Sequence, residues 1–202
     1  MSTLTKRDLI AALGALGATP AIAQTPAAPV RVDLATALGA ITLELAADKA
    51  PITAANFLRY VDARRYDGGV FYRAMKLAAA PPAGLIQGGL RGDPARTFAP
   101  IAHESTQQTG LRHKDGTISM ARYAPGSATS EFFICVGDLP SLDADPTAPG
   151  DNLGFAAFGH VVTGMDVVLK ILAAPVSLTE GEGVMRGQML SPPVAIGGIR
   201  RE

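Results

Sequence analysis

Alternation of apolar and polar side chains marks the first structured segment of the chain. Residues 30–34 read Val-Arg-Val-Asp-Leu, and residues 41–45 read Ile-Thr-Leu-Glu-Leu after Gly39. A period of two places every second side chain on the same face of a β-strand, and a glycine between two such runs suits a turn. The sequence therefore predicts a β-hairpin over residues 30–45.

Two other segments have the spacing of a helix with one apolar face. Pro51 suits the first turn of a helix, and a second helix is predicted to begin after Gly164. The apolar positions three to four residues apart are Ala54, Phe57, Leu58 and Val61 in the first segment and Met165, Val168, Leu169 and Leu172 in the second. Each helix is expected to lay its apolar face on a sheet.

Short apolar segments between clusters of Gly, Pro and Asp predict the remaining strands. They are Gly69 to Arg73, Leu85 to Gly88, Thr117 to Ala121, Glu131 to Val136, Phe155 to Val162 and Val194 to Ile199. The last strand is expected to pair with the N-terminal hairpin. The 22 glycines and 15 prolines are spread along the chain, which favours many short elements. A closed antiparallel barrel capped by two helices fits this pattern and leaves no open sheet edge.

The first 23 residues are predicted to be a signal peptide. Lys6 and Arg7 precede an apolar stretch over residues 9–18, and Ala21-Ile22-Ala23 supplies small residues for cleavage before Gln24. An amphipathic first helix is the alternative, but the segment has no polar stripe. The protein is thus expected in the periplasm, with residues 24–29 as a Pro/Ala spacer and 30–202 as one domain. Whether export uses the general or the twin-arginine pathway stays open.

Charge and composition exclude several classes of protein. Lys and Arg together number 18, as do Asp and Glu, and removal of the leader leaves 16 basic and 17 acidic residues. A neutral chain has no basic field for nucleic acid. No later segment is long and apolar enough to span a bilayer. Cys135 lies in an apolar run and is expected to be a buried, inert thiol.

Four segments, in order and spread over most of the mature chain, resemble the cyclophilin family of peptidyl-prolyl isomerases. They are Phe71-Tyr72-Arg73, Gln87-Gly88-Gly89, Gly116 to Arg122 (GTISMAR) and Ser127 to Ile134 (SATSEFFI). The segments Ala50 to Phe57 and Phe158 to Val161 also match. The third and fourth segments are most similar to the exported bacterial branch. Each segment alone is a weak signal, whereas their combination is specific.

The resemblance implies a mainly β fold, an eight-stranded antiparallel barrel with two helices, and rotation about the peptide bond before proline. It implies that Arg73 is catalytic and that no metal or cofactor is needed. The implied substrate-binding residues are Leu85, Gln87, Ala121, Arg122, Glu131, Phe133, Leu142 and Phe155. The expected partners are proline-containing unfolded or exported polypeptides, bound by a monomer without nucleic acid or membrane.

Some positions depart from the family pattern. The stretch between Arg73 and Gln87 is longer than usual, Gly84 stands where a pocket phenylalanine is common, and Ser141 replaces a tryptophan. Phe155 occupies the position of the family's pocket histidine and could restore apolar area. These changes predict a shallower proline pocket and reduced efficiency.

Two other functions compete with catalysis of rotation. A barrel that holds proline segments without accelerating rotation is the main alternative, motivated by the altered pocket. A metal-dependent hydrolase is suggested only by His103-Glu104 with His113 and His160, whose spacing lacks the helical His-Glu-x-x-His pair. A serine hydrolase is disfavoured because no Gly-x-Ser-x-Gly motif occurs. Arg91-Gly92-Asp93 is interpreted as a turn.

Overall fold

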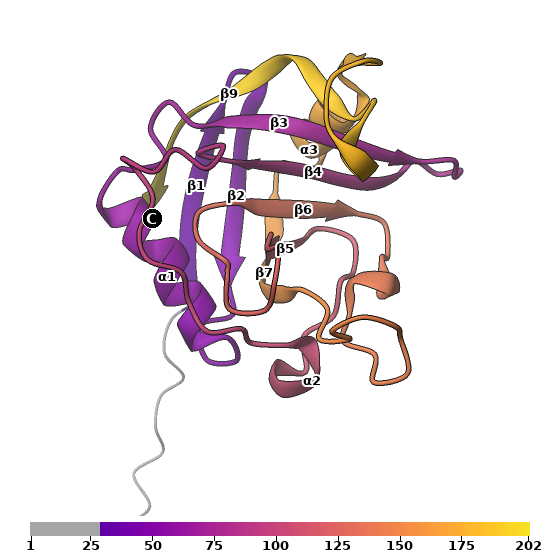
Figure 1. Cartoon of the computed structure of the whole chain (residues 1–202). Coiled ribbons are helices and arrows are strands. Elements are labelled where there is room, and N and C mark those ends of the chain that lie inside the picture. The colour runs from indigo at the N-terminus through magenta and orange to yellow at the C-terminus, as the bar shows by residue number, and fades with distance from the viewer. Residues whose placement is uncertain (1–28) are drawn as a thin grey trace, which may run out of the picture.

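The computed structural model describes residues 29–202 and shows a closed barrel of antiparallel strands (Figure 1). The predicted leader, residues 1–23, lies outside the described residues. The strands are β1 (Val30–Thr36), β2 (Gly39–Leu45), β3 (Val70–Leu77), β4 (Ala83–Gly89), β5 (Thr117–Met120), β6 (Phe132–Val136), β7 (Ala156–Thr163), β8 (Val176–Ser177) and β9 (Met189–Arg201). Their order is β1-β2-β7-β5-β6-β4-β3-β9, with β8 added beside β9.

Pairing of β1 with β9 closes the ring. Leu34 pairs with Ile199, and the same strand β9 pairs through Val194 with Phe71 of β3. Both edges of the sheet are thereby satisfied, which a closed barrel achieves and an open sheet does not. The predicted eight-stranded barrel is confirmed, with the two-residue β8 as an addition.

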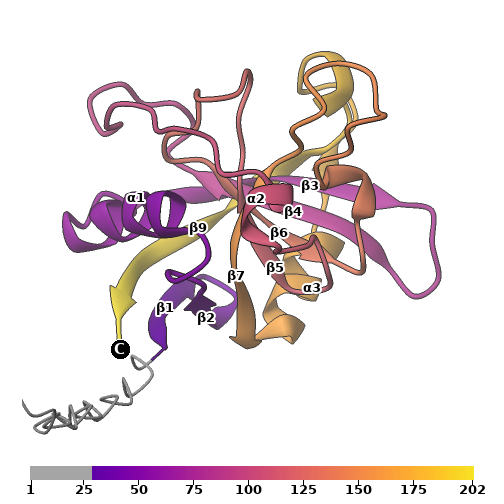
Figure 2. The same ribbon diagram turned by 90° about the horizontal axis from the view of Figure 1, so that it is seen from below.

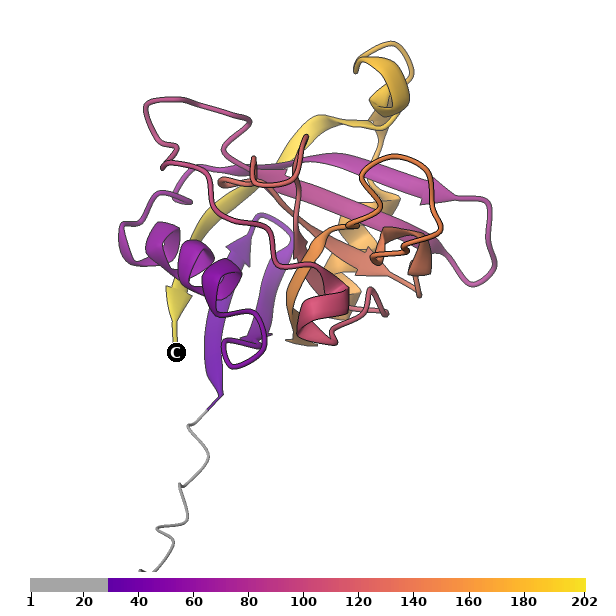
Figure 3. The same ribbon diagram turned by 60° about the horizontal axis from the view of Figure 1, so that its bottom comes forward.

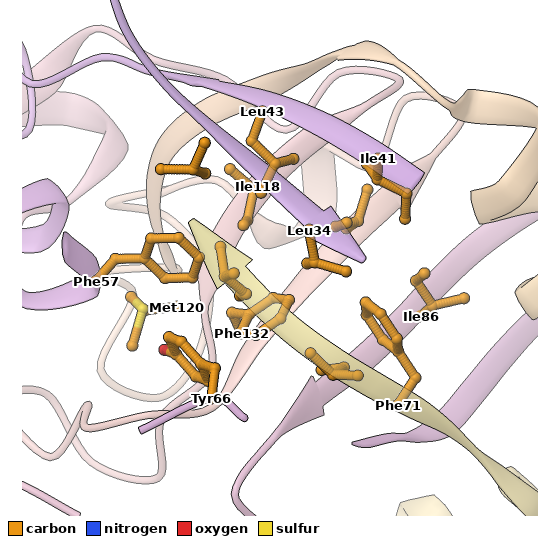
Figure 4. Packing of buried hydrophobic residues seen from close by; sticks show 14 of the residues in the cluster. Leu34, Ile41, Leu43, Phe57, Tyr66, Phe71, Ile86, Ile118, Met120 and Phe132 are labelled. Atoms are coloured by element: carbon orange, nitrogen blue, oxygen red, sulfur yellow. The ribbon is translucent and has the colours of Figure 1, made fainter. Parts of the chain in front are cut away.

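The barrel encloses an aromatic and aliphatic core (Figure 4). Phe57, Tyr66 and Phe132 are fully buried, and the Phe132 ring meets the other two edge-on at centroid distances of 5.5 and 5.6 Å. Edge-to-face contacts of this kind add about 0.5–1.5 kcal/mol per pair beyond area burial. The packing fixes β6, the strand that also carries Phe133.

Two helices pack against the barrel as predicted. They are α1 (Pro51–Asp62), which contacts β7 and β9, and α3 (Met165–Ala173), which contacts β2, β3, β4 and β6. The N-terminus of α1 has no side-chain cap of its own, but Glu104 accepts hydrogen bonds from the backbone N–H groups of Ile52 and Thr53 at 3.1 and 2.7 Å. Such an acceptor satisfies donors that the first helical turn leaves free.

The long stretch between Arg73 and Gln87 is an extension of the β3–β4 hairpin. The two strands remain paired as far as Leu77 and Ala83, and the hairpin projects from the barrel in Figure 2. Residues 78–82 at its tip do not line the groove described below. The extra length therefore lengthens a hairpin and does not cover the site.

Several elements were not predicted from the sequence. They are the one-turn helix α2 (Thr106–Thr109), the 3₁₀ turns η1 (Pro140–Leu142) and η2 (Gly183–Met185), strand β8 and the first five residues of β9. Figure 3 shows the segment between β8 and β9, coloured orange to yellow, standing out beyond β3. Within residues 29–202, no helix is long and apolar enough to cross a membrane.

Candidate functional site

One wall of the barrel carries a groove of about 560 Å³, formed by side chains of β3, β4 and β6 and by the loops beside them. The structure places all nine sequence-predicted site residues in its lining: Arg73, Leu85, Gln87, Ala121, Arg122, Glu131, Phe133, Leu142 and Phe155. Further lining residues that were not predicted include Tyr72, Met75, Arg91, Tyr123, Met185 and Met189. The groove combines one polar side with a mainly apolar floor.

Arg73 is held on the polar side by two neutral amides. Its Nη1 donates to Oε1 of Gln87 at 2.9 Å, and its Nε donates to Oε1 of Gln188 at 2.8 Å. No carboxylate among residues 29–202 forms an ion pair with it. Partial burial lowers the pKa of Arg73 from its ordinary value, yet an arginine stays charged at neutral pH. The groove therefore contains an oriented positive charge that forms no ion pair with a carboxylate of the described residues.

Gln87 is fixed in turn by Tyr72. Gln87 and Arg73 are register partners on β4 and β3, and Nε2 of Gln87 donates to the Tyr72 hydroxyl at 2.8 Å. Burial, and next the nearby Glu131 carboxylate, raise the pKa of Tyr72. The phenol therefore stays neutral, and the amide of Gln87 has a defined orientation with its oxygen toward Arg73.

Glu131 has a structural role that the sequence did not reveal. Its Oε1 accepts hydrogen bonds from the backbone N–H of Leu90 at 2.9 Å and of Gly92 at 3.3 Å. Its Oε2 is buried and has no hydrogen-bond partner among the described residues. The carboxylate thus shapes the loop after β4 while it also faces the groove.

The apolar floor is built around Phe133. Phe155 meets the Phe133 ring edge-on at 5.5 Å, and Leu85 and Leu142 pack in the same cluster together with Met75. Gly84 and Ser141 do not line the groove. Phe155 and Met75 supply apolar surface where the sequence lacks the common aromatic residues. The shallower pocket itself stays a prediction.

A buried polar group supports this floor from behind. Nδ1 of His113 lies 2.7 Å from Oδ1 of Asp143, and Nε2 lies 2.9 Å from Oγ of Ser119. A carboxylate only accepts, so Nδ1 carries the proton and Nε2 accepts from the hydroxyl. The connectivity is that of a Ser-His-Asp relay, but the Ser119 side chain is fully buried. A nucleophile must reach its substrate, so this trio does not act as one.

Arg122 fixes the opposite rim. Its guanidinium binds both carboxylate oxygens of Asp151 at 2.8 Å and lies 5.3 Å from the centre of the Phe155 ring. The hydrogen bonding from Arg122, and next the backbone N–H of Leu153, lower the pKa of Asp151 to about 2. The pair therefore holds the loop before β7 against the groove across the neutral pH range.

The histidines that suggested a metal hydrolase are separate from one another. His103 contacts the carbonyl oxygen of Leu153, and His113 is committed to Asp143 and Ser119. Glu104 is used at the start of α1. In the part of the chain that the structure describes, no three His, Cys, Asp or Glu side chains lie together as metal ligands.

Comparison with known proteins identifies the family. The family described as cyclophilin type peptidyl-prolyl cis-trans isomerase/CLD matches residues 31–190. A peptidyl-prolyl cis-trans isomerase of Acinetobacter baylyi is 41% identical over 176 residues, which cover 85% of each chain. The chain belongs to the cyclophilin-type peptidyl-prolyl cis-trans isomerase family.

Other relatives agree with this assignment. Peptidyl-prolyl cis-trans isomerase A of Dickeya dadantii is 38% identical over 175 residues, covering 83% of this cyclophilin and 85% of the relative. A crystal structure of a Cryptosporidium parvum cyclophilin superposes with a TM-score of 0.67 at 21% identity and covers 86% of this chain and 98% of that one. The Cryptosporidium structure shows the fold, and the two bacterial relatives show the activity. This cyclophilin is an isomerase of proline-containing peptides.

Proposed function

We propose that this cyclophilin accelerates rotation about X-Pro bonds in unfolded exported proteins, with Arg73 as its catalytic residue. The observation that carries the proposal is the guanidinium of Arg73, held by Gln87 and Gln188 beside an apolar floor and paired with no carboxylate of the described chain. The reaction needs no nucleophile, because rotation makes and breaks no covalent bond.

The geometry suits a twisted amide. Rotation removes amide resonance at a barrier of about 18–20 kcal/mol, and the nitrogen lone pair becomes localised. A guanidinium N–H donates to that lone pair, so Arg73 binds the rotated state more strongly than either planar isomer. Only such differential binding raises the rate. Phe133 and its neighbours would receive the pyrrolidine ring, while the backbone of Ala121 and Arg122 would bind the residue before proline.

The decisive experiment compares Arg73→Ala with Arg31→Ala. Arg31 forms a surface ion pair with Glu44, a contact of little energetic weight, and serves as the matched control. Exchange spectroscopy on a proline-containing peptide would measure catalysis, and titration would measure its Kd. We expect Arg73→Ala to lower kcat/KM about 100-fold or more, as loss of one oriented donor does, with peptide affinity nearly retained. Unchanged catalysis in Arg73→Ala would overturn the catalytic assignment.

The same experiment separates the isomerase from a passive binding module. A module would bind the peptide while exchange stays at the uncatalysed rate of tens to hundreds of seconds even in the wild-type protein. The relatives that are named isomerases support the catalytic function.

The exported location and the monomeric state are part of the proposal. The exported location is supported by the basic, apolar and small-residue segments of the first 23 positions. Expression of the full chain in a Gram-negative host should yield a periplasmic protein whose mass corresponds to a start at Gln24. Ala23→Arg should block this cleavage, and light scattering should give the mass of one chain. Retention of the uncleaved protein in the cytoplasm would contradict the export proposal.

A further inference from the structure

Arg73 is oriented from the side of β9 as well as from the side of β4. The Nε–H, which lies on the stem side of the guanidinium, is 2.8 Å from Oε1 of Gln188, a residue 115 positions later in the chain. Gln87 binds Nη1 on another edge. Two of the five guanidinium N–H groups are therefore used, and the remaining three, including both on Nη2, have no hydrogen-bond partner among residues 29–202.

Gln188 is itself held in place by its backbone. Its carbonyl oxygen accepts from the Ala74 N–H at 2.9 Å, directly beside Arg73, and its own N–H donates to the Met185 carbonyl at 3.0 Å. The next residue, Met189, is the register partner of Arg73 in the β3–β9 ladder. The backbone of Gln188 is therefore held independently of its side chain, so the contact with the Nε–H costs side-chain entropy but no further backbone entropy.

The two contacts together restrict the rotation of the guanidinium. A single hydrogen bond at Nη1 would leave the planar group free to turn about its bonds to the stem. A second acceptor at Nε fixes the plane and directs Nη2 toward the remaining space of the groove. Catalysis by an oriented donor depends on such placement, and a misplacement of about 1 Å can cost up to 100-fold in rate.

We propose that Gln188 is a positioning residue for isomerisation: by accepting the Nε–H of Arg73 it fixes the guanidinium in the orientation that the rotating amide requires. The inference rests on the proposed catalytic role of Arg73. It assigns a function to the segment between β8 and β9, which the sequence pattern left without one.

The test uses Gln188→Met, which keeps the approximate length of the side chain and removes the amide, including the oxygen that accepts the Nε–H. Gln107→Met is the control, because Gln107 is exposed on α2, away from the groove lining. At saturating peptide, we expect kcat to fall about tenfold in Gln188→Met, with peptide Kd and thermal midpoint nearly unchanged. Gln107→Met should match the wild type in all three quantities.

A second readout reports on the contact itself. In the wild type, the Arg73 Nε–H should give a dispersed NMR signal that exchanges slowly with water, and Gln188→Met should make that exchange fast. An unchanged kcat, or a fall in kcat with the Nε–H signal still protected, would overturn the inference. If Arg73→Ala lowers kcat while Gln188→Met does not, the proposed function stands and only the positioning role fails. If Arg73→Ala has no effect, the proposed function fails first.

Discussion

The imidazole of His113 is stacked on the ring of Phe133, with centroids 5.8 Å apart and planes inclined by 17°. Phe133 faces the groove, whereas His113 is 1% exposed and bound to Asp143 and Ser119. The floor of the groove thus lies directly on a buried titratable group, whose protonation state affects the stability of the site.

We expect stability to fall below about pH 6.5 because of His113. Burial lowers the pKa of His113 from its ordinary value of 6.5, despite the opposing effect of Asp143. Between pH 6.5 and the folded pKa, His113 therefore binds more protons in the unfolded chain than in the folded protein. The free energy of unfolding should be constant near pH 7–8 and fall with a slope of up to about 1.4 kcal/mol per pH unit between pH 6.5 and the folded pKa.

Urea unfolding at a series of pH values checks this prediction. In His113→Gln the slope between pH 6.5 and 5 should disappear, whatever the absolute stability of that variant. His160→Gln, at an exposed position, should retain it. A wild-type slope that survives in His113→Gln would assign the effect to other groups.

Replacing Gly84 by an aromatic residue should destabilise the protein and should not add a wall to the pocket. Gly84 has a φ of +146°, and a Cβ there would lie 1.9 Å from the Met75 carbonyl oxygen on the paired strand. Backbone must move to make room, so we expect Gly84→Ala to lower the free energy of unfolding by about 2–4 kcal/mol. Gly84→Phe should be at least as unstable and should not deepen the pocket.

Gly68→Ala is the matched control for Gly84→Ala. Gly68 also has a positive φ, +70°, but no atom lies within 4 Å of a Cβ built there. This substitution should lower the free energy of unfolding by only about 1–2 kcal/mol, the cost of a left-handed backbone conformation for alanine. Equal losses in the two variants would show that the close approach of β3 and β4 is not the constraint at position 84.

The Cys135 thiol should be unreactive in the folded protein. It is fully buried in the cluster behind the groove, and burial raises its pKa to about 12. Because the thiolate is the reactive form, a chromogenic thiol reagent at pH 8 should label native protein hardly at all and denatured protein with one equivalent. Rapid labelling under native conditions would contradict the packing of β6.

The charge on Arg73 should matter separately from its orientation. In Gln188→Glu the carboxylate still accepts the Nε–H, but it also pairs with the guanidinium and weakens its field at the rotating amide. We therefore expect a protected Nε–H signal together with a several-fold lower kcat. A rate equal to that of the wild type would show that a neutral partner is not required.

The sequence predicts the parts of this fold that have a local pattern. The hairpin of β1 and β2 follows from strict alternation over residues 30–34 and 41–45, and α1 follows from Pro51 and its apolar spacing. The first residues of β9 were missed because Pro192 and Pro193 interrupt the apolar pattern of a strand. The one-turn helix α2 was missed although Ser105 and Gln108 form a capping box that the sequence displays.

The candidate site, like the fold, contains residues that the sequence predicts and residues that it does not. Six of the nine predicted residues lie in the matching motifs, and the other three, Leu85, Leu142 and Phe155, were implied by the family resemblance; all nine line the groove. Gln188 could not be predicted from a sequence motif, because only the pairing of β3 with β9 brings it close to Arg73. Tyr72 is the instructive omission: it adjoins Arg73 in sequence, but its contact with Gln87 depends on the registry of β3 and β4.

The double pairing of β9 has a consequence for the order of folding. The strand is synthesised after the seven others of the ring, and until it arrives both β1 and β3 present unpaired backbone groups. A nascent chain that lacks these residues would leave two sheet edges unpaired, and unpaired edges favour association with edges of other chains. Because Gln188 directly precedes β9, the hydrogen bond between Gln188 and Arg73 is expected to form together with the closure of the barrel.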